Sequence, residues 1–188
     1  LWRLKSKFIA ASNSRDAVKA AERLAREGYT PIINLLGEHY RSRKKIDRTV
    51  DDYRYLIDLL AQFHIKGRVS LKPTQIGLAV SKESYAWNLM AILRHAHSQK
   101  HIQDVPVEID IEKKARAYDT LEVFRHVPGE FNVRQAIQAY FHVSEKDIAE
   151  FIKCGRKVRL VKGAYAEGEF SKVQVDDRMI ALSEQLIA

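Results

Sequence analysis

The chain has 188 residues, 46% of them hydrophobic, so it is long enough to bury the core of one globular domain. No apolar stretch approaches the ~20 residues that a transmembrane helix needs, and the first residues lack the layout of a secretory signal. The formal net charge of +8 favours an anionic partner, but the charge is spread along the chain without a nucleic-acid-binding motif, so no nucleic acid is expected.

Short apolar segments alternate with amphipathic ones along the chain. Strands are predicted over 7–11, 30–36, 69–71, 105–111, 133–137 and 158–161. Helices are predicted after them over 14–27, 47–63, 81–95, 115–125, 144–154 and 176–187. Ser14 is predicted to cap the first helix, and Ser144 to open the fifth as a variant of the capping box. Strand and helix units in this order predict a parallel sheet.

The spacing of these units is typical of an α/β fold of the (β/α)8 TIM-type barrel, with about six βα units present. A full barrel needs ~250 residues, so the last two units are expected to be absent. No linker-like composition interrupts the sequence, and residues 1–188 therefore predict a single barrel domain, truncated at its C-terminus. A doubly wound open sheet is the alternative, but no Gly-x-Gly-x-x-Gly follows a strand.

The segment 159–165, Arg-Leu-Val-Lys-Gly-Ala-Tyr, carries the strongest functional signal. Two cations, Arg159 and Lys162, interrupt an apolar strand, where an unpaired charge would cost several kcal/mol. Gly163 permits a sharp turn or the close approach of a ligand. The pattern therefore suits an anionic cofactor or substrate at the carboxyl end of a strand. Since side chains alternate, Arg159 and Lys162 reach one ligand only if the chain leaves strand geometry near Gly163.

Polar residues also lie at or just after the ends of the other predicted strands. In chain order these are Asn34 and Glu38, Ser70 and Lys72, Asp110 and Glu112, and Gln138 and Tyr140. A single polar residue at a strand end is usually just solvated. A run of such ends predicts one shared site, because the carboxyl ends of parallel strands meet at the same face of a barrel.

These strand ends resemble the signature segments of the proline dehydrogenase family, also called proline oxidases. The resembling segments are Leu-Leu-Gly-Glu at 35–38, Ser-Leu-Lys at 70–72, Ile-Asp-Ile-Glu at 109–112, Gln-Ala-Tyr at 138–140 and the segment 159–165. They occur in the family's order and span nearly the whole chain. The resemblance implies FAD-dependent oxidation of L-proline to pyrroline-5-carboxylate, with electrons passed to a membrane quinone. It also implies a cytoplasmic protein and allows a peripheral contact with the inner membrane.

The resemblance assigns roles to individual residues. It implies that Lys72, Asp110 and Arg159 are catalytic, with Lys72 and Asp110 paired near the substrate. The residues that it implies for flavin binding are Gln138, Arg159, Lys162, Gly163, Ala164 and Tyr165. Cations near the flavin favour its reduced, more negative state. Asn34 departs from the family, which usually has aspartate there, and the helix that holds the proline in the family is expected to lie beyond this chain.

Two alternatives come from other classes of protein. Lys162 at a barrel strand end could form a Schiff base in an aldolase-like lyase. A non-catalytic basic module would instead bind nucleic acid in a salt-dependent way. A metal centre is not expected, because the histidines at 95, 97 and 101 are typical of a solvated helix end.

Overall fold

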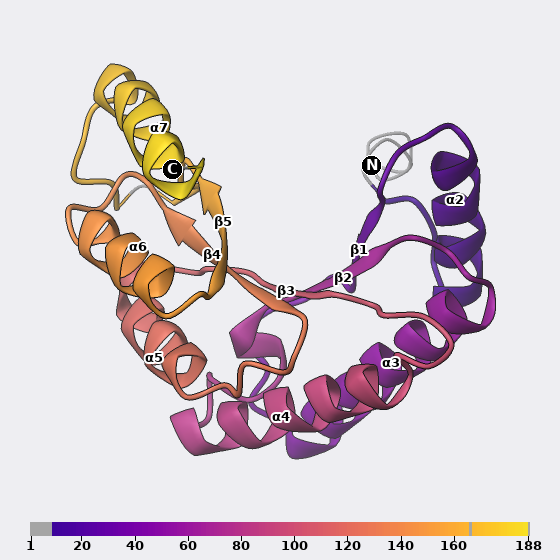
Figure 1. Ribbon diagram of the computed structural model, residues 1–188. Coiled ribbons are helices and arrows are strands. Elements are labelled where there is room, and N and C mark those ends of the chain that lie inside the picture. Colours follow the sequence, from indigo (N-terminus) through magenta and orange to yellow (C-terminus); the bar gives the residue numbers. More distant parts are fainter. Residues whose placement is uncertain (1–8, 166, 188) are drawn as a thin grey trace.

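The computed structural model describes residues 9–165 and 167–187, and its centre is a parallel sheet (Figure 1). The five strands are β1 (Ile32–Asn34), β2 (Arg68–Leu71), β3 (Val107–Ile109), β4 (Val133–Gln138) and β5 (Lys157–Val161). Their order in the sheet is their order in the chain, and every neighbouring pair is parallel. Parallel neighbours require a crossover connection, and a helix supplies it between each pair.

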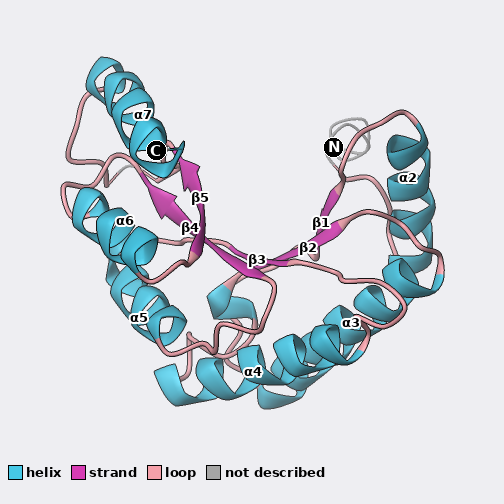
Figure 2. Ribbon diagram, in the orientation of Figure 1, coloured by secondary structure: helices cyan, strands magenta, loops and turns pink. Residues whose placement is uncertain are grey.

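The helices lie along the convex side of the curved sheet (Figures 1 and 2). They are α2 (Ser14–Arg26), α3 (Arg43–Gln62), α4 (Lys82–Ser98), α5 (Lys114–Arg125), α6 (Ser144–Lys153) and α7 (Lys172–Ile187), with a short 3-10 helix, η1 (Pro73–Gln75). The expected α/β fold of the TIM type is thus confirmed. Among the described residues the sheet is not closed, and β1 and β5 are its edges. Every described helix is too short or too polar to cross a lipid bilayer.

Alternation along the strands separates an apolar face from a charged one. Val69, Leu71, Val107 and Ile109 are fully buried in the core that the helices cover. Glu108, between the two β3 core residues, contacts side chains of β2, β4 and β5 on the concave face instead. The sheet therefore carries its apolar side chains toward the helices and a row of charges on the other side.

Three details of the sequence prediction need correction. The strand predicted over 7–11 is not seen: residues 9–11 form no strand, and Lys7 and Phe8 lie outside the described residues. Five βα units are therefore described instead of six. Asn13, not Ser14, caps α2, because its side-chain oxygen accepts the amide hydrogen of Asp16 at 3.0 Å. Ser144 does not cap α6, since its hydroxyl donates to the carbonyl of Gln138.

Candidate active site

A hydrogen-bonded cluster around Asp110 joins four strands on the concave face. The guanidinium of Arg159 on β5 lies 2.5 Å from Asp110 Oδ1, just beyond β3. The hydroxyl of Ser70 on β2 donates to the same oxygen at 2.8 Å, and the amide of Asn34 on β1 donates to Oδ2 at 3.3 Å. All four residues were predicted to lie at strand ends, and the structure brings them together.

Two residues before Asp110, the carboxylate of Glu108 lies close to three arginines. The carboxylate is only 1% exposed, and Arg68 Nη1 donates to its Oε1 at 3.0 Å. Arg134 Nη1 lies 3.7 Å from the same oxygen, and Arg159 Nε lies 3.7 Å from the other. Neither Glu108 nor Arg68 was predicted to belong to the site. The available signal was the period of two, which places residue 108 on the same face as Asp110.

Lys72 follows β2 and pairs with a different carboxylate from the expected one. Its ammonium donates to Glu38 at 3.3 Å, whereas Asp110 is taken by Arg159 from across the sheet. The expected Lys72–Asp110 pair is therefore wrong. Partial burial lowers the pKa of Lys72, but the neighbouring acidic groups of Tyr165, Glu38 and Glu112 outweigh it and hold that pKa above its ordinary value. Lys72 is consequently a fixed cation at this edge of the site.

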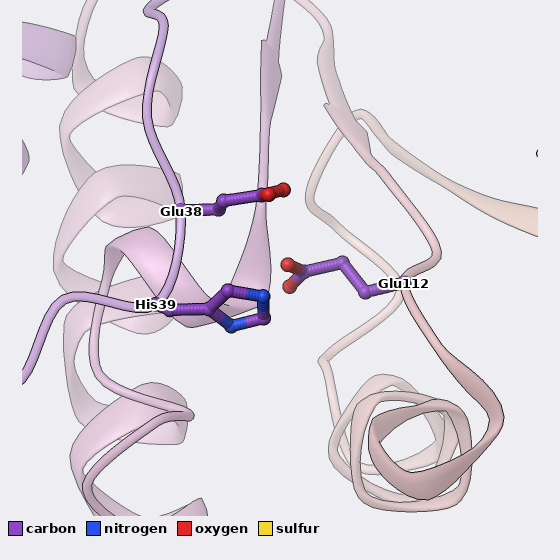
Figure 3. Close-up of side chains that lie close together, drawn as sticks. All are labelled: Glu38, His39 and Glu112. Carbon is purple, nitrogen blue, oxygen red and sulfur yellow. The ribbon is translucent and has the colours of Figure 1, made fainter. Parts of the chain in front are cut away.

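Glu38, His39 and Glu112 point toward one another (Figure 3), and Glu38 also pairs with Lys72. One nitrogen or oxygen from each of the three lies within 4.8 Å of the others. The Glu112 oxygens already accept the amide and hydroxyl of Thr74, at 2.8 and 2.6 Å. The amide of His39 donates to the same hydroxyl at 2.9 Å. Because protein donors satisfy both carboxylates, this cluster ties together the loops that follow β1, β2 and β3.

Gln138 is the last residue of β4, and the oxygen of its side-chain amide has no hydrogen-bond partner among the described residues. Its Nε2 donates weakly to the carbonyl of Glu112 at 3.4 Å. Its amide oxygen, Oε1, is buried. A buried acceptor without a donor costs about 1–3 kcal/mol, so a donor from a ligand would be favourable here. Gln138 is paired with Val161 in the sheet, two residues beyond Arg159, and so lies on the same face.

The chain leaves strand geometry immediately after β5, which ends at Val161. Gly163 has φ +122°, a conformation open mainly to glycine. The ring of Tyr140 packs directly against it, and a Cβ on Gly163 would lie 1.5 Å from ring carbons. The glycine therefore admits a tyrosine from the end of β4, rather than leaving space for a ligand.

Lys162 points away from Arg159. Its ammonium pairs with Asp176 on α7, and its side chain is 57% exposed. Arg159 instead pairs with Asp110 on the concave face of the sheet. The Lys162 hydrogen bond also lowers the pKa of Asp176. A paired, solvated ammonium is a poor nucleophile, and this geometry disfavours the Schiff-base alternative.

Two residues after Gly163, Tyr165 lies near the Lys72 end of the site. Burial raises the pKa of its hydroxyl, and Lys72 opposes that shift. Ala164, between Gly163 and Tyr165, is exposed. Residues 163–165 thus form a turn from the Tyr140 ring toward Lys72.

The three histidines in the last turn of α4 and just beyond it do not converge. His95 Nε2 bonds to Asp58 at 2.7 Å, His97 contacts Lys100, and His101 contacts the carbonyl of Ser98. Each ring has a separate local partner on or near the outer helices. These contacts are what a solvated helix end provides, apart from the Asp58 contact, which the sequence did not indicate.

Comparison with known proteins gives one consistent family. Residues 17–184 match the family described as Proline dehydrogenase. Proline dehydrogenase 1 of Bacillus subtilis (strain 168) is 35% identical over 162 residues, which are 86% of this chain and 52% of the relative. Proline dehydrogenase of Deinococcus radiodurans is 31% identical over 170 residues, 89% of this chain and 54% of the relative. The chain thus spans about half the length of the curated relatives it matches.

Solved structures agree on the fold. Proline utilization A from Bdellovibrio bacteriovorus, inactivated by N-propargylglycine, superposes with a TM-score of 0.87 at 22% identity, covering 98% of this chain and 24% of that one. Proline utilization A from Corynebacterium freiburgense gives a TM-score of 0.78 at 18% identity, covering 94% and 22%. At these identities the likeness supports the arrangement of strands and helices and nothing finer.

Proposed function

The chain belongs to the proline dehydrogenase family, and we propose that it provides the flavin face and part of the substrate face of an enzyme that oxidises L-proline to pyrroline-5-carboxylate. The observation that carries this proposal is the meeting of four polar residues at one end of the sheet, three of them in the signature segments. Asn34, Ser70, Asp110 and Arg159 come from four strands and share hydrogen bonds there. Family membership supplies the reaction class, and this cluster supplies the residues.

Gln138 supports FAD as the cofactor. Its buried Oε1 lacks a donor among the described residues, and its Nε2 makes only a 3.4 Å bond. The pyrimidine edge of a flavin offers alternating donors and acceptors, which is the pattern that a side-chain amide can complement. The residues present therefore fit the group. When bound, FAD would supply the acceptor for the hydride equivalent that leaves the proline ring.

Arg159 would contribute a fixed positive charge beside the flavin. It stands two residues before Val161, the register partner of Gln138, and Asp110 holds its guanidinium at 2.5 Å. A guanidinium oriented in this way favours negative charge in a neighbouring group without having to reorganise. One border of the cofactor site would be formed by Lys162 and the turn at 163–165, that is Gly163, Ala164 and Tyr165. Lys162 would reach the cofactor only by releasing Asp176.

Lys72 and Asp110 would face the substrate. The raised pKa of Lys72 keeps its ammonium charged, so it suits a carboxylate partner and not the role of a base. Asp110 would hold Arg159 and present negative charge toward the amine of proline. Electron transfer to a membrane quinone, a cytoplasmic location and peripheral membrane contact complete the proposal, and all three rest on the family alone.

The direct test is turnover by the complete protein. Purified with FAD, it is expected to reduce an electron-accepting dye only when L-proline is present, and to form pyrroline-5-carboxylate detectable by its mass. Arg159→Met is expected to slow this turnover. Lys157→Met is its matched control, because it removes a cation from the opposite end of β5, where Lys157 contacts Asn132. Absence of proline-dependent turnover in the complete protein would refute the proposal.

A further inference from the structure

The concave face carries more positive than negative charge around one buried carboxylate. Three arginines, Arg68, Arg134 and Arg159, surround Glu108, and Asp110 takes a second contact from Arg159. The five side chains come from or adjoin four strands, β2 to β5. Within this cluster, which we name the Glu108 network, the formal charges sum to +1.

Two unpaired atoms face each other inside the Glu108 network. Glu108 Oε2 and Arg159 Nε are both buried without a hydrogen-bond partner among the described residues. They lie 3.7 Å apart, close enough for strong charge attraction and slightly too far for a hydrogen bond. Meanwhile Arg159 Nη2 is bonded to Asp110 at 2.5 Å. Glu108 on β3 and Asp110 just beyond it therefore contact two different nitrogens of the Arg159 guanidinium.

The other arginines keep Glu108 in place for this contact. Arg68 bonds to Oε1 at 3.0 Å and Arg134 lies 3.7 Å from that same atom, which leaves Oε2 for Arg159. A carboxylate this deeply buried is stable as a charge only with such partners. Arg134 is also one of the polar residues that the apolar pattern of a buried parallel strand does not account for.

We propose that Glu108, Arg68 and Arg134 are positioning residues for Arg159, and that their charges set the reduction potential of the flavin beside it. This inference rests on the proposed function. Reduction adds negative charge to the flavin, so any charge held nearby in a weakly screened interior changes the potential according to its sign. Glu108 lowers the potential by offsetting Arg159, and Arg134 raises it by offsetting Glu108.

The test compares variants that remove a negative charge with variants that remove a positive charge from the Glu108 network. In the flavin-loaded complete protein, Glu108→Gln is expected to make the midpoint potential more positive, and Arg134→Met to make it more negative. Arg134→Lys, which keeps the charge, should stay close to the wild type. Glu150→Gln removes a carboxylate from outer helix α6, where Glu150 pairs with Arg125, and is the charge control. Spectroelectrochemical titration reads the potential without any turnover.

The sign of the shifts separates the outcomes. Shifts in opposite directions, each larger than that of Glu150→Gln, support the inference, whereas a loss of packing alone has no reason to change sign with charge. Equal potentials in all variants, or shifts of one sign, would overturn it while leaving the proposed function intact. A complete protein that takes up no flavin would overturn both.

Discussion

Arg159 on β5 and Asp110, the residue just after β3, lie 2.5 Å apart although β4 separates these two strands. Ala136, the β4 residue paired with Arg159 in the sheet, has only a methyl side chain. The long arginine can therefore cross β4 on the concave face and reach Asp110. This contact replaces the Lys72–Asp110 pair expected from sequence, and links the proposed flavin side of the site to the proposed substrate side.

The Arg159–Asp110 contact predicts non-additive losses. Arg159→Met and Asp110→Asn should each slow flavin reduction by L-proline at least tenfold, ~1.4 kcal/mol, and the double variant should lose less than the product of the two. Rapid-mixing absorbance in the complete protein measures the rate. The matched cycle of Lys72→Met with Asp110→Asn should come closer to multiplying, because Lys72 pairs with Glu38. Strictly multiplicative losses for Arg159 and Asp110 would contradict the contact.

Gly163→Ala is expected to destabilise the protein by more than about 2 kcal/mol, since it adds a methyl group against the Tyr140 ring at a positive φ. Gly155→Ala is the control. Gly155 has φ +62° with nothing within 4 Å of an added Cβ, so only backbone strain of about 1 kcal/mol is expected. Urea unfolding of the complete proteins gives both values. Equal losses would show that the Tyr140 packing is unimportant.

Thr74 supplies a hydroxyl that both donates to Glu112 at 2.6 Å and accepts the His39 amide at 2.9 Å. Thr74→Val has nearly the same shape but removes both bonds at a fully buried position. We expect a loss of about 2–3 kcal/mol in the free energy of unfolding, because one partner is a carboxylate. Thr74→Ser keeps the hydroxyl and should lose about 1 kcal/mol for its missing methyl. A valine variant more stable than the serine variant would contradict a stabilising role for the hydroxyl.

Glu169 connects the segment after residues 163–165 to Lys114 and to the amide of His142. Its contribution to the free energy of unfolding should depend on pH. The Lys114 ammonium and the amide of His142 hold the pKa of Glu169 below its usual 4.5. A lowered folded-state pKa stabilises the protein above the unfolded value, and that contribution is lost as the pH falls through the folded value. Glu169→Gln should thus reduce stability at about pH 7 and much less at about pH 3.5. Glu130→Gln, at an exposed position, should change little at either pH. A loss at Glu169 that is the same at both pH values would contradict this assignment.

The five described strands and the strand-end residues could be read from the sequence because both are local patterns. Apolar runs and caps bound the elements, and the carboxyl ends of parallel strands must share a face. The partners of those residues were not readable in the same way. Whether Asp110 meets Lys72 or Arg159 depends on how far a side chain reaches across β4. Local capping alternatives were also too close to separate, as Asn13 and Ser14 show.

The visible absorption spectrum of the complete protein, recorded while L-proline is added without an electron acceptor, tests the central claim most directly. The account predicts flavin absorbance that L-proline bleaches, with bleaching at least tenfold slower in Arg159→Met, or ~1.4 kcal/mol, and unaltered in Lys157→Met. A complete protein without bound flavin after supply of FAD, or one whose flavin stays oxidised in L-proline, would contradict it.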